Sequence, residues 1–223
     1  LHRLIRRQRQ MCIRDRREIM LRLRDEGVSC IDLVTGTHYT PTIAEALSGL
    51  SLGIPVVWNS SGYESVETLR QLSGLVQIYM PDFKYWDSAA AKRYSAAADY
   101  PQTARAAIKE MYRQTGSYVL DESGMLRSGV LIRHLILPGR SEDAMNVIDF
   151  AADEFPRGSV LFSLMSQYTP QPGAEGKLAR KVTKAEYRAA ERYMADCGIA
   201  DGFTQERTSA KEEYTPDFHL QGI

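Results

Sequence analysis

The chain has 223 residues, of which 43% are hydrophobic and 25% charged, and its 28 basic side chains balance 28 acidic ones. This composition is typical of a globular domain large enough to bury a core without disulfides, and it excludes a low-complexity chain. No apolar run approaches the roughly 18 residues that a membrane span requires, so we expect no membrane partner. The cysteines Cys12, Cys30 and Cys197 are too far apart in sequence to suggest a disulfide framework. This spacing favours a reducing compartment, and we predict a cytoplasmic protein.

Residues 1–16 differ from the rest of the chain. They hold six arginines and one acidic residue, Asp15, which leaves the remainder with 22 basic and 27 acidic residues. A basic arm on an acidic body is one signature of nucleic-acid binding. This arm, however, has no lysine or glycine and ends in MCIRDR, which resembles translated adapter sequence. We therefore expect it to be artefactual or foreign, with no nucleic-acid partner, and predict a folded body over 17–206 and a polar tail over 207–223.

From Arg17 onward, helical and strand patterns alternate. Helices are predicted over residues 17–26, 41–53, 64–72, a stretch beginning at Pro101, 141–155 and 184–197. Strands are predicted over 30–36, 54–62, 76–84, 129–139 and 159–168. Apolar strands separated by helices are typical of a parallel sheet buried on both faces. Five such units favour an α/β barrel, or part of one, over an open sheet.

Polar side chains stand at or just after the carboxyl ends of all five predicted strands, where the active site of an α/β barrel forms. These candidate site residues are Thr35, Thr37, His38, Asn59, Ser60, Ser61, Gly62, Asp82, Lys84, Arg133, Gln167 and Tyr168. Lys84 and Arg133 are suited to binding a carboxylate, and the hydroxyls and amides to binding ribose or amino groups. The pattern predicts a site for a polar, partly anionic small molecule.

Each of these residues also has a plainer structural interpretation. Asp82 is typical of a turn and Lys84 of a solvated loop. The run 59–62 is equally consistent with a turn in which the glycine supplies a positive φ. Arg133 and His134 are adjacent, so on an ideal strand only one of them faces the barrel interior, and the histidine is equally consistent with a structural role.

Six segments, in this order, carry a resemblance to a known family: NSSGYE (59–64), IYMPDFKY (78–85), YSAAADYP (94–101), EMYRQTG (110–116), IRHLILPG (132–139) and LMSQYTPQ (164–171). Together they resemble radical S-adenosylmethionine proteins, close to homologues of pyruvate formate-lyase activating enzyme, over about residues 17–206. The resemblance implies a partial (β/α)6 barrel of the TIM type that binds S-adenosylmethionine and a [4Fe–4S] cluster. It also implies reductive cleavage of S-adenosylmethionine to a 5′-deoxyadenosyl radical, which abstracts hydrogen. The implied partners are a glycyl radical enzyme or another protein substrate, and flavodoxin or ferredoxin as reductant.

The resemblance also implies roles for the candidate residues. It places Thr35–His38 where the family often has a Gly-Gly-Glu that holds the methionine amino group, a motif that this sequence lacks. It places Asn59–Gly62 beneath the ribose, Asp82 and Lys84 at the methionine end, and Arg133 near the carboxylate or ribose. Gln167 and Tyr168 then approach the adenosyl group.

The CxxxCxxC cluster motif of the family does not occur in this sequence. Its position in the family is upstream of Arg17, so we expect a chain truncated at its N-terminus, without its first strand and cluster loop and without a metal site of its own. Such a fragment would be inactive as written. Two alternatives remain: a cluster-free barrel that serves as a binding or scaffold protein, and an aldolase-type barrel in which Lys84 forms a Schiff base.

Overall fold

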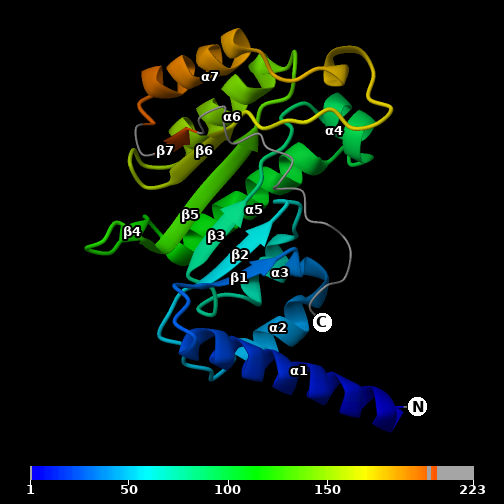
Figure 1. Cartoon of the computed structure of the whole chain (residues 1–223), viewed down its shortest axis with the longest axis vertical. Coiled ribbons are helices and arrows are strands. Elements are labelled where there is room, and N and C mark those ends of the chain that lie inside the picture. The colour runs from blue at the N-terminus through cyan, green and yellow to red at the C-terminus, as the bar shows by residue number, and fades with distance from the viewer. Residues whose placement is uncertain (1, 200–201, 205–223) are drawn as a thin grey trace.

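Six parallel strands, arranged side by side in chain order, make the sheet at the centre of this computed structural model (Figure 1). The structure describes residues 2–199 and 202–204, and the side chains of 13–199; the tail predicted over 207–223 lies outside them. The parallel strands are β1 (Ile31–Val34), β2 (Val56–Ser60), β3 (Ile78–Pro81), β5 (Leu126–Leu135), β6 (Leu161–Met165) and β7 (Gly202–Thr204). A short strand, β4 (Val119–Leu120), pairs with β5 in the antiparallel direction.

Helices lie in the connections between successive parallel strands, except the first helix, which precedes β1. They are α1 (His2–Asp25), α2 (Thr40–Leu47), α3 (Val66–Arg70), α4 (Ser88–Ser95), α5 (Tyr100–Thr115), α6 (Ser141–Glu154) and α7 (Lys184–Asp196), with short 3-10 helices over Gly36–Tyr39 and Gly176–Ala179. Right-handed crossovers between neighbouring parallel strands place their helices on one face of the sheet. Among the described residues, no helix is long and apolar enough to cross a membrane.

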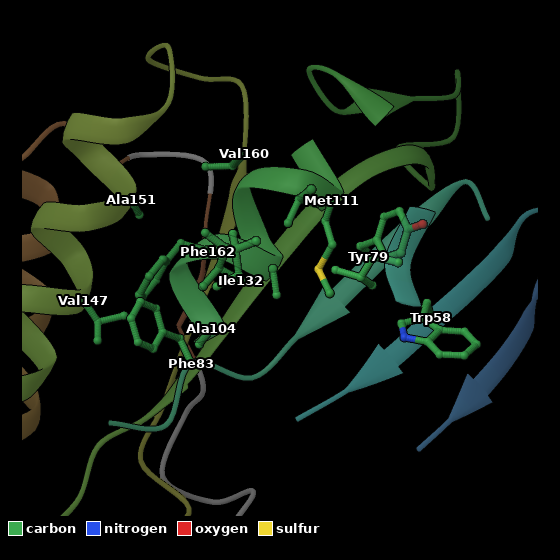
Figure 2. Close-up of a cluster of buried hydrophobic side chains, with 14 of the residues drawn as sticks. Trp58, Tyr79, Phe83, Ala104, Met111, Ile132, Val147, Ala151, Val160 and Phe162 are labelled. Atoms are coloured by element: carbon green, nitrogen blue, oxygen red, sulfur yellow. The ribbon is translucent and has the colours of Figure 1, made fainter. Parts of the chain in front are cut away.

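The hydrophobic core lies between this helical layer and the sheet. Figure 2 shows Tyr79, Ile132 and Phe162 of three neighbouring strands close to side chains of α5 and α6. All three are fully buried, as are Ala104 and Met111 of α5. Strand residues of the other parity, such as Met80 and Leu131, point to the opposite face, because side chains alternate along a strand. That opposite face carries the candidate site.

The order of the strands distinguishes this sheet from a doubly wound one. The sheet runs β1-β2-β3-β5-β6-β7 without a reversal, whereas a doubly wound sheet reverses at a switch point. The prediction of an α/β fold with a parallel sheet is therefore confirmed. β1 and β7 lie at opposite edges of the sheet, so the described residues form an open sheet with the strand order of a barrel, and the predicted partial barrel remains a proposal.

Several elements differ from the sequence-based expectation. The first helix begins at His2 rather than Arg17, and Ile13, within the segment expected to be foreign, is buried in the core. The helix over Ser88–Ser95 and the short strands β4 and β7 were not predicted. The alanine-rich helix and the two- and three-residue strands carry too little hydrophobic periodicity to be recognised.

Arg17 joins α1 to α2. Its guanidinium donates to three main-chain carbonyls at the end of α2: Nε to Ala46 at 2.8 Å, and Nη2 to Glu45 at 3.0 Å and Ser48 at 2.6 Å. The last carbonyls of a helix have no partners within it and carry the negative end of its dipole. One side chain thereby satisfies several of these acceptors.

We predict that Arg17→Ala lowers the free energy of unfolding by about 1–2 kcal/mol, because charged hydrogen bonds to the carbonyls are lost. Arg14→Ala, on the same helix, is the matched control. Arg14 is 79% exposed and, among the described residues, pairs only with Glu18, so we expect no measurable change. Urea unfolding of both variants measures the difference, and equal stabilities would contradict this role for Arg17.

Candidate functional site

An ion-paired cluster lies on the face of the sheet opposite the helices, at the carboxyl ends of β2, β3 and β5. Arg133 Nη2 lies 2.7 Å from Asp82 Oδ1 and donates to Asn59 Oδ1 at 2.7 Å. Lys84 Nζ lies 3.6 Å from the other carboxylate oxygen of Asp82. The amide of Asn59 in turn donates to Asp32 on β1 at 3.2 Å. A polar network therefore extends across four neighbouring strands.

The register of β3 and β5 brings Asp82 and Arg133 together. Tyr79 is paired with Val130, and the pairing resumes three residues later between Asp82 and Arg133. The ladder is interrupted at Pro81, which has no N–H to donate. Phe83 then donates its N–H to the carbonyl of Arg133 at 2.8 Å. Both charged side chains consequently point to the same face of the sheet.

A cavity of about 420 Å³ adjoins this cluster. Its lining combines charged, aromatic and apolar side chains: Asp82, Lys84, Tyr85, Arg133, Leu135, Leu137, Met165, Gln167 and Tyr168. Two cations and one carboxylate leave this lining with one excess positive charge. Arg133 Nε is buried and has no hydrogen-bond partner among the residues that the structure describes. Because an unpaired buried donor is costly, the cavity is suited to a ligand that brings an acceptor, most simply a carboxylate.

His134 faces away from this cavity, as strand alternation requires. It is buried, and its Nδ1 lies 2.6 Å from the carbonyl of Phe83. Burial lowers the pKa of His134, so the ring is neutral at pH 7, and Nδ1 must carry the proton because a carbonyl only accepts. His134 therefore holds the backbone between Asp82 and Lys84 from the helical side.

A second buried cluster, around Glu64, holds the loops after β1 and β2. Glu64 is 2% exposed and accepts from three neutral donors: the Thr37 hydroxyl at 2.8 Å, the Trp58 indole at 2.7 Å and the Ser60 hydroxyl at 2.6 Å. Hydrogen bonds from several donors compensate a buried carboxylate for lost hydration. Thr37 and Ser60 are thereby turned toward Glu64 and away from the cavity.

The structure brings only some of the twelve predicted residues together. Asp82, Lys84, Arg133, Gln167 and Tyr168 line one cavity, and Asn59 is bonded to it through Arg133. The remaining six lie at the ends of β1 and β2 and do not line that cavity: Thr35, Thr37, His38, Ser60, Ser61 and Gly62. Thr35, His38 and Ser61 are exposed, and Thr35 has a left-handed backbone with φ 55°.

Sequence reasoning missed several residues of the site. Tyr85, Leu135, Leu137 and Met165 line the cavity although none was selected. Three of these four lie at alternate positions from Arg133 or at the end of β6, so strand alternation could have identified them. Glu64 gave no signal, because a lone glutamate after a loop is typical of a solvated residue.

The described residues do not fit an iron–sulfur cluster. No group of three or more His, Cys, Asp or Glu side chains gathers to hold a metal within the described part of the chain. Cys30 precedes β1 and Cys197 follows α7, at the end of the sheet away from the cavity. The side chain of Cys12 lies outside the described residues.

The chain is similar in sequence to a curated protein over most of its length. No protein-family model matches the chain. The chain is 28% identical over 167 residues to an uncharacterized protein of Methanocaldococcus jannaschii, which covers 72% of this chain and 45% of that protein. The chain thus spans less than half the length of the curated relative that it matches.

Solved structures share the fold. SuiB of Streptococcus suis, in a crystal structure with S-adenosylmethionine, matches with a TM-score of 0.55 and 14% identity over 90% of this chain and 45% of that chain. SuiB bound to its precursor peptide SuiA has a TM-score of 0.57 and 15% identity over 87% of this chain and 42% of that chain. A domain of pyruvate-formate lyase-activating enzyme from Bacteroides vulgatus has a TM-score of 0.54 and 12% identity over 79% of this chain and 98% of that domain. Identities this low establish a common fold and nothing finer.

Gly62 is required where the loop after β2 passes Asp82. It has φ +72°, and a Cβ there would collide with the carbonyl oxygen of Asp82. Gly74 has a similar φ of +76°, but a Cβ at that position would meet nothing within 4 Å. Both glycines have a left-handed backbone, but only Gly62 is buried and closely approached by another segment.

We predict that Gly74→Ala lowers the free energy of unfolding by about 1–2 kcal/mol, the cost of a left-handed alanine. Gly62→Ala should cost about 1–3 kcal/mol more, because the methyl group overpacks against backbone. Chemical denaturation measures both. Equal losses would show that the loop after β2 is not pressed against Asp82.

Proposed function

We propose that this chain is the S-adenosylmethionine-binding part of a radical S-adenosylmethionine enzyme. The observation that carries the proposal is the buried, unpaired Nε of Arg133 beside a cavity with one excess positive charge. That cavity lies at the carboxyl ends of parallel strands, where α/β sheets bind ligands. The fold shared with SuiB, which has been crystallised with S-adenosylmethionine, supports this assignment.

The chemistry of the lining suggests how the ligand is held. Arg133 and Lys84 would bind the methionine carboxylate, and Asp82 the amino group, since opposite charges and charge-assisted hydrogen bonds favour these pairs. Gln167 and Tyr168, on the segment after β6, would lie against the adenosyl group, and Asn59 near the ribose. Thr35, Thr37, His38, Ser60, Ser61 and Gly62 would shape the loops around the ligand rather than line the cavity.

The radical chemistry belongs to the whole protein in this proposal. The described residues do not hold a [4Fe–4S] cluster, so the one-electron reduction of S-adenosylmethionine that a cluster would supply would depend on ligands outside them. The residues of this chain bind and orient the ligand and shield it from water. By likeness to the activating-enzyme domain, and to SuiB with its precursor peptide, we propose a protein or peptide substrate, with a glycyl radical enzyme as one instance and flavodoxin or ferredoxin as reductant.

Two other functions are less well supported. A binding or scaffold protein would use the same cavity without the cluster, and a continuous upstream reading frame that lacks the three cysteines would favour it. A Schiff-base aldolase requires a sheltered, neutral Lys84. The side chain of Lys84 is 43% exposed and pairs with Asp82, which stabilises the charged ammonium form.

We predict that Lys84→Ala weakens S-adenosylmethionine binding by about 1–3 kcal/mol, or about 5- to 150-fold, through the loss of a charged contact. Lys109→Ala is the matched control. Lys109 is similarly exposed, at 48%, and pairs with Glu154 on the helical side, so it should leave binding unchanged. Equilibrium dialysis with labelled S-adenosylmethionine measures both dissociation constants. No binding by the unmodified chain, or equal effects of the two variants, would refute the proposed site.

We also predict that this chain, reconstituted anaerobically with iron and sulfide, shows no charge-transfer absorption of a [4Fe–4S] cluster. The physical reason is that three thiolates must converge on the cluster, and Cys30 and Cys197 lie away from the cavity. A version extended upstream to include a CxxxCxxC segment is the positive control. A stable four-iron spectrum from this chain alone would overturn our account of where the cluster ligands lie.

A further inference from the structure

The loops after β2 and β3 meet at the hydroxyl of Tyr100, the first residue of α5. The main-chain N–H of Lys84 donates to this hydroxyl at 2.8 Å. The hydroxyl in turn lies 2.8 Å from the carbonyl of Ser61 and 2.8 Å from that of Asp82, and its single proton is shared between them. One oxygen atom therefore joins three points of backbone from two loops.

Tyr100 is fixed independently of any ligand. The side chain is 3% exposed, and its ring stacks on Tyr63 with centroids 5.7 Å apart and meets Tyr85 edge-on at 5.6 Å. Burial raises the pKa of Tyr100, so the hydroxyl keeps its proton and remains a donor throughout the physiological range. Packing of the ring thus sets the position of the hydroxyl, and the backbone of both loops contacts it there.

Tyr100 does not line the cavity, but both of its neighbours on the loop after β3 do. Asp82 and Lys84 present their side chains to the cavity, while the carbonyl of one and the N–H of the other are bound by Tyr100. Gly62, in the loop after β2, packs closely against the carbonyl oxygen of Asp82. Movement of this joint would displace two of the three charged groups that face a ligand.

We propose that Tyr100 is a positioning residue, which sets the Asp82–Lys84 pair for ligand binding through backbone contacts from two loops. The inference rests on the proposed function as far as the identity of the ligand is concerned. The positioning itself is a property of the ligand-free chain, so it is tested separately.

The first measurement is hydrogen exchange of single amides in Tyr100→Phe, which removes one oxygen atom and keeps the ring. The amide of Lys84 should exchange at least tenfold faster than in the unmodified chain. The amide of Thr35, which donates to Asn59 at 2.9 Å without touching Tyr100, should be unchanged. Unchanged exchange at Lys84, or equal acceleration at Thr35, would overturn the proposal.

The second measurement is S-adenosylmethionine binding, at a temperature where all variants are folded by circular dichroism. Tyr100→Phe should raise the dissociation constant at least fivefold. Tyr79→Phe is the matched control, because it removes another buried hydroxyl from β3, one that donates to Gln114 at 2.6 Å remote from the cavity. A general loss of stability would weaken binding equally in both variants and would contradict the proposal.

A double variant separates positioning from a merely structural role. If Tyr100 acts through Lys84, then Tyr100→Phe should have a clearly smaller effect on binding in a Lys84→Ala background than in the unmodified chain. If the double variant raises the dissociation constant by the product of the two single effects, Tyr100 does not act through Lys84. If the unmodified chain does not bind S-adenosylmethionine, the proposed function fails, while the exchange of the Lys84 amide still decides whether Tyr100 holds the loop.

Discussion

The candidate site depends on one topological constraint, the parallel arrangement of neighbouring strands in chain order. Because every connection returns through a helix on the same face, all six carboxyl ends meet at one edge of the sheet and the other face is left for side chains of one parity. Asp32, Asn59, Asp82 and Arg133 come from four strands and share that face only because the register is continuous. A slip of one residue in β3 or β5 would turn Asp82 or Arg133 into the helical layer.

The charges of the site are balanced in a way that leaves capacity for a ligand. Asp82 contacts both Arg133 and Lys84, so neither cation faces the cavity without compensation. Removing the carboxylate would leave two cations close together and partly dehydrated, a costly arrangement. With the carboxylate present, the excess is a single positive charge and the free donor is Arg133 Nε. In the proposed function, this excess positive charge attracts the anionic group of the ligand.

The sequence predicts the strands and the charged residues of the site better than the residues that hold them in place. Continuous apolar runs mark β2, β3, β5 and β6, and polar residues at their ends identify Asp82, Lys84 and Arg133. Ser60 and Thr37 were selected by the same rule, but they bond to Glu64 on the helical side. A position at a strand end does not determine the face to which a hydroxyl points when a buried acceptor binds it.

The residues that hold the site in place were unpredictable for a related reason. Tyr100 appears in sequence as a helix start before Pro101, and its contacts with Ser61 and Lys84 span 39 and 16 positions. Such contacts arise from packing that no local pattern encodes.

Neutral groups hold the backbone beneath the charged side chains of the site. The backbone of residues 82–84 is held from the helical side by neutral His134 and from the β2 side by the protonated hydroxyl of Tyr100. Since burial shifts the pKa of the first downward and that of the second upward, neither changes charge near pH 7. The position of this backbone should therefore not change with pH near neutrality. The groups that hold this backbone come from β5, from the loop after β2 and from α5.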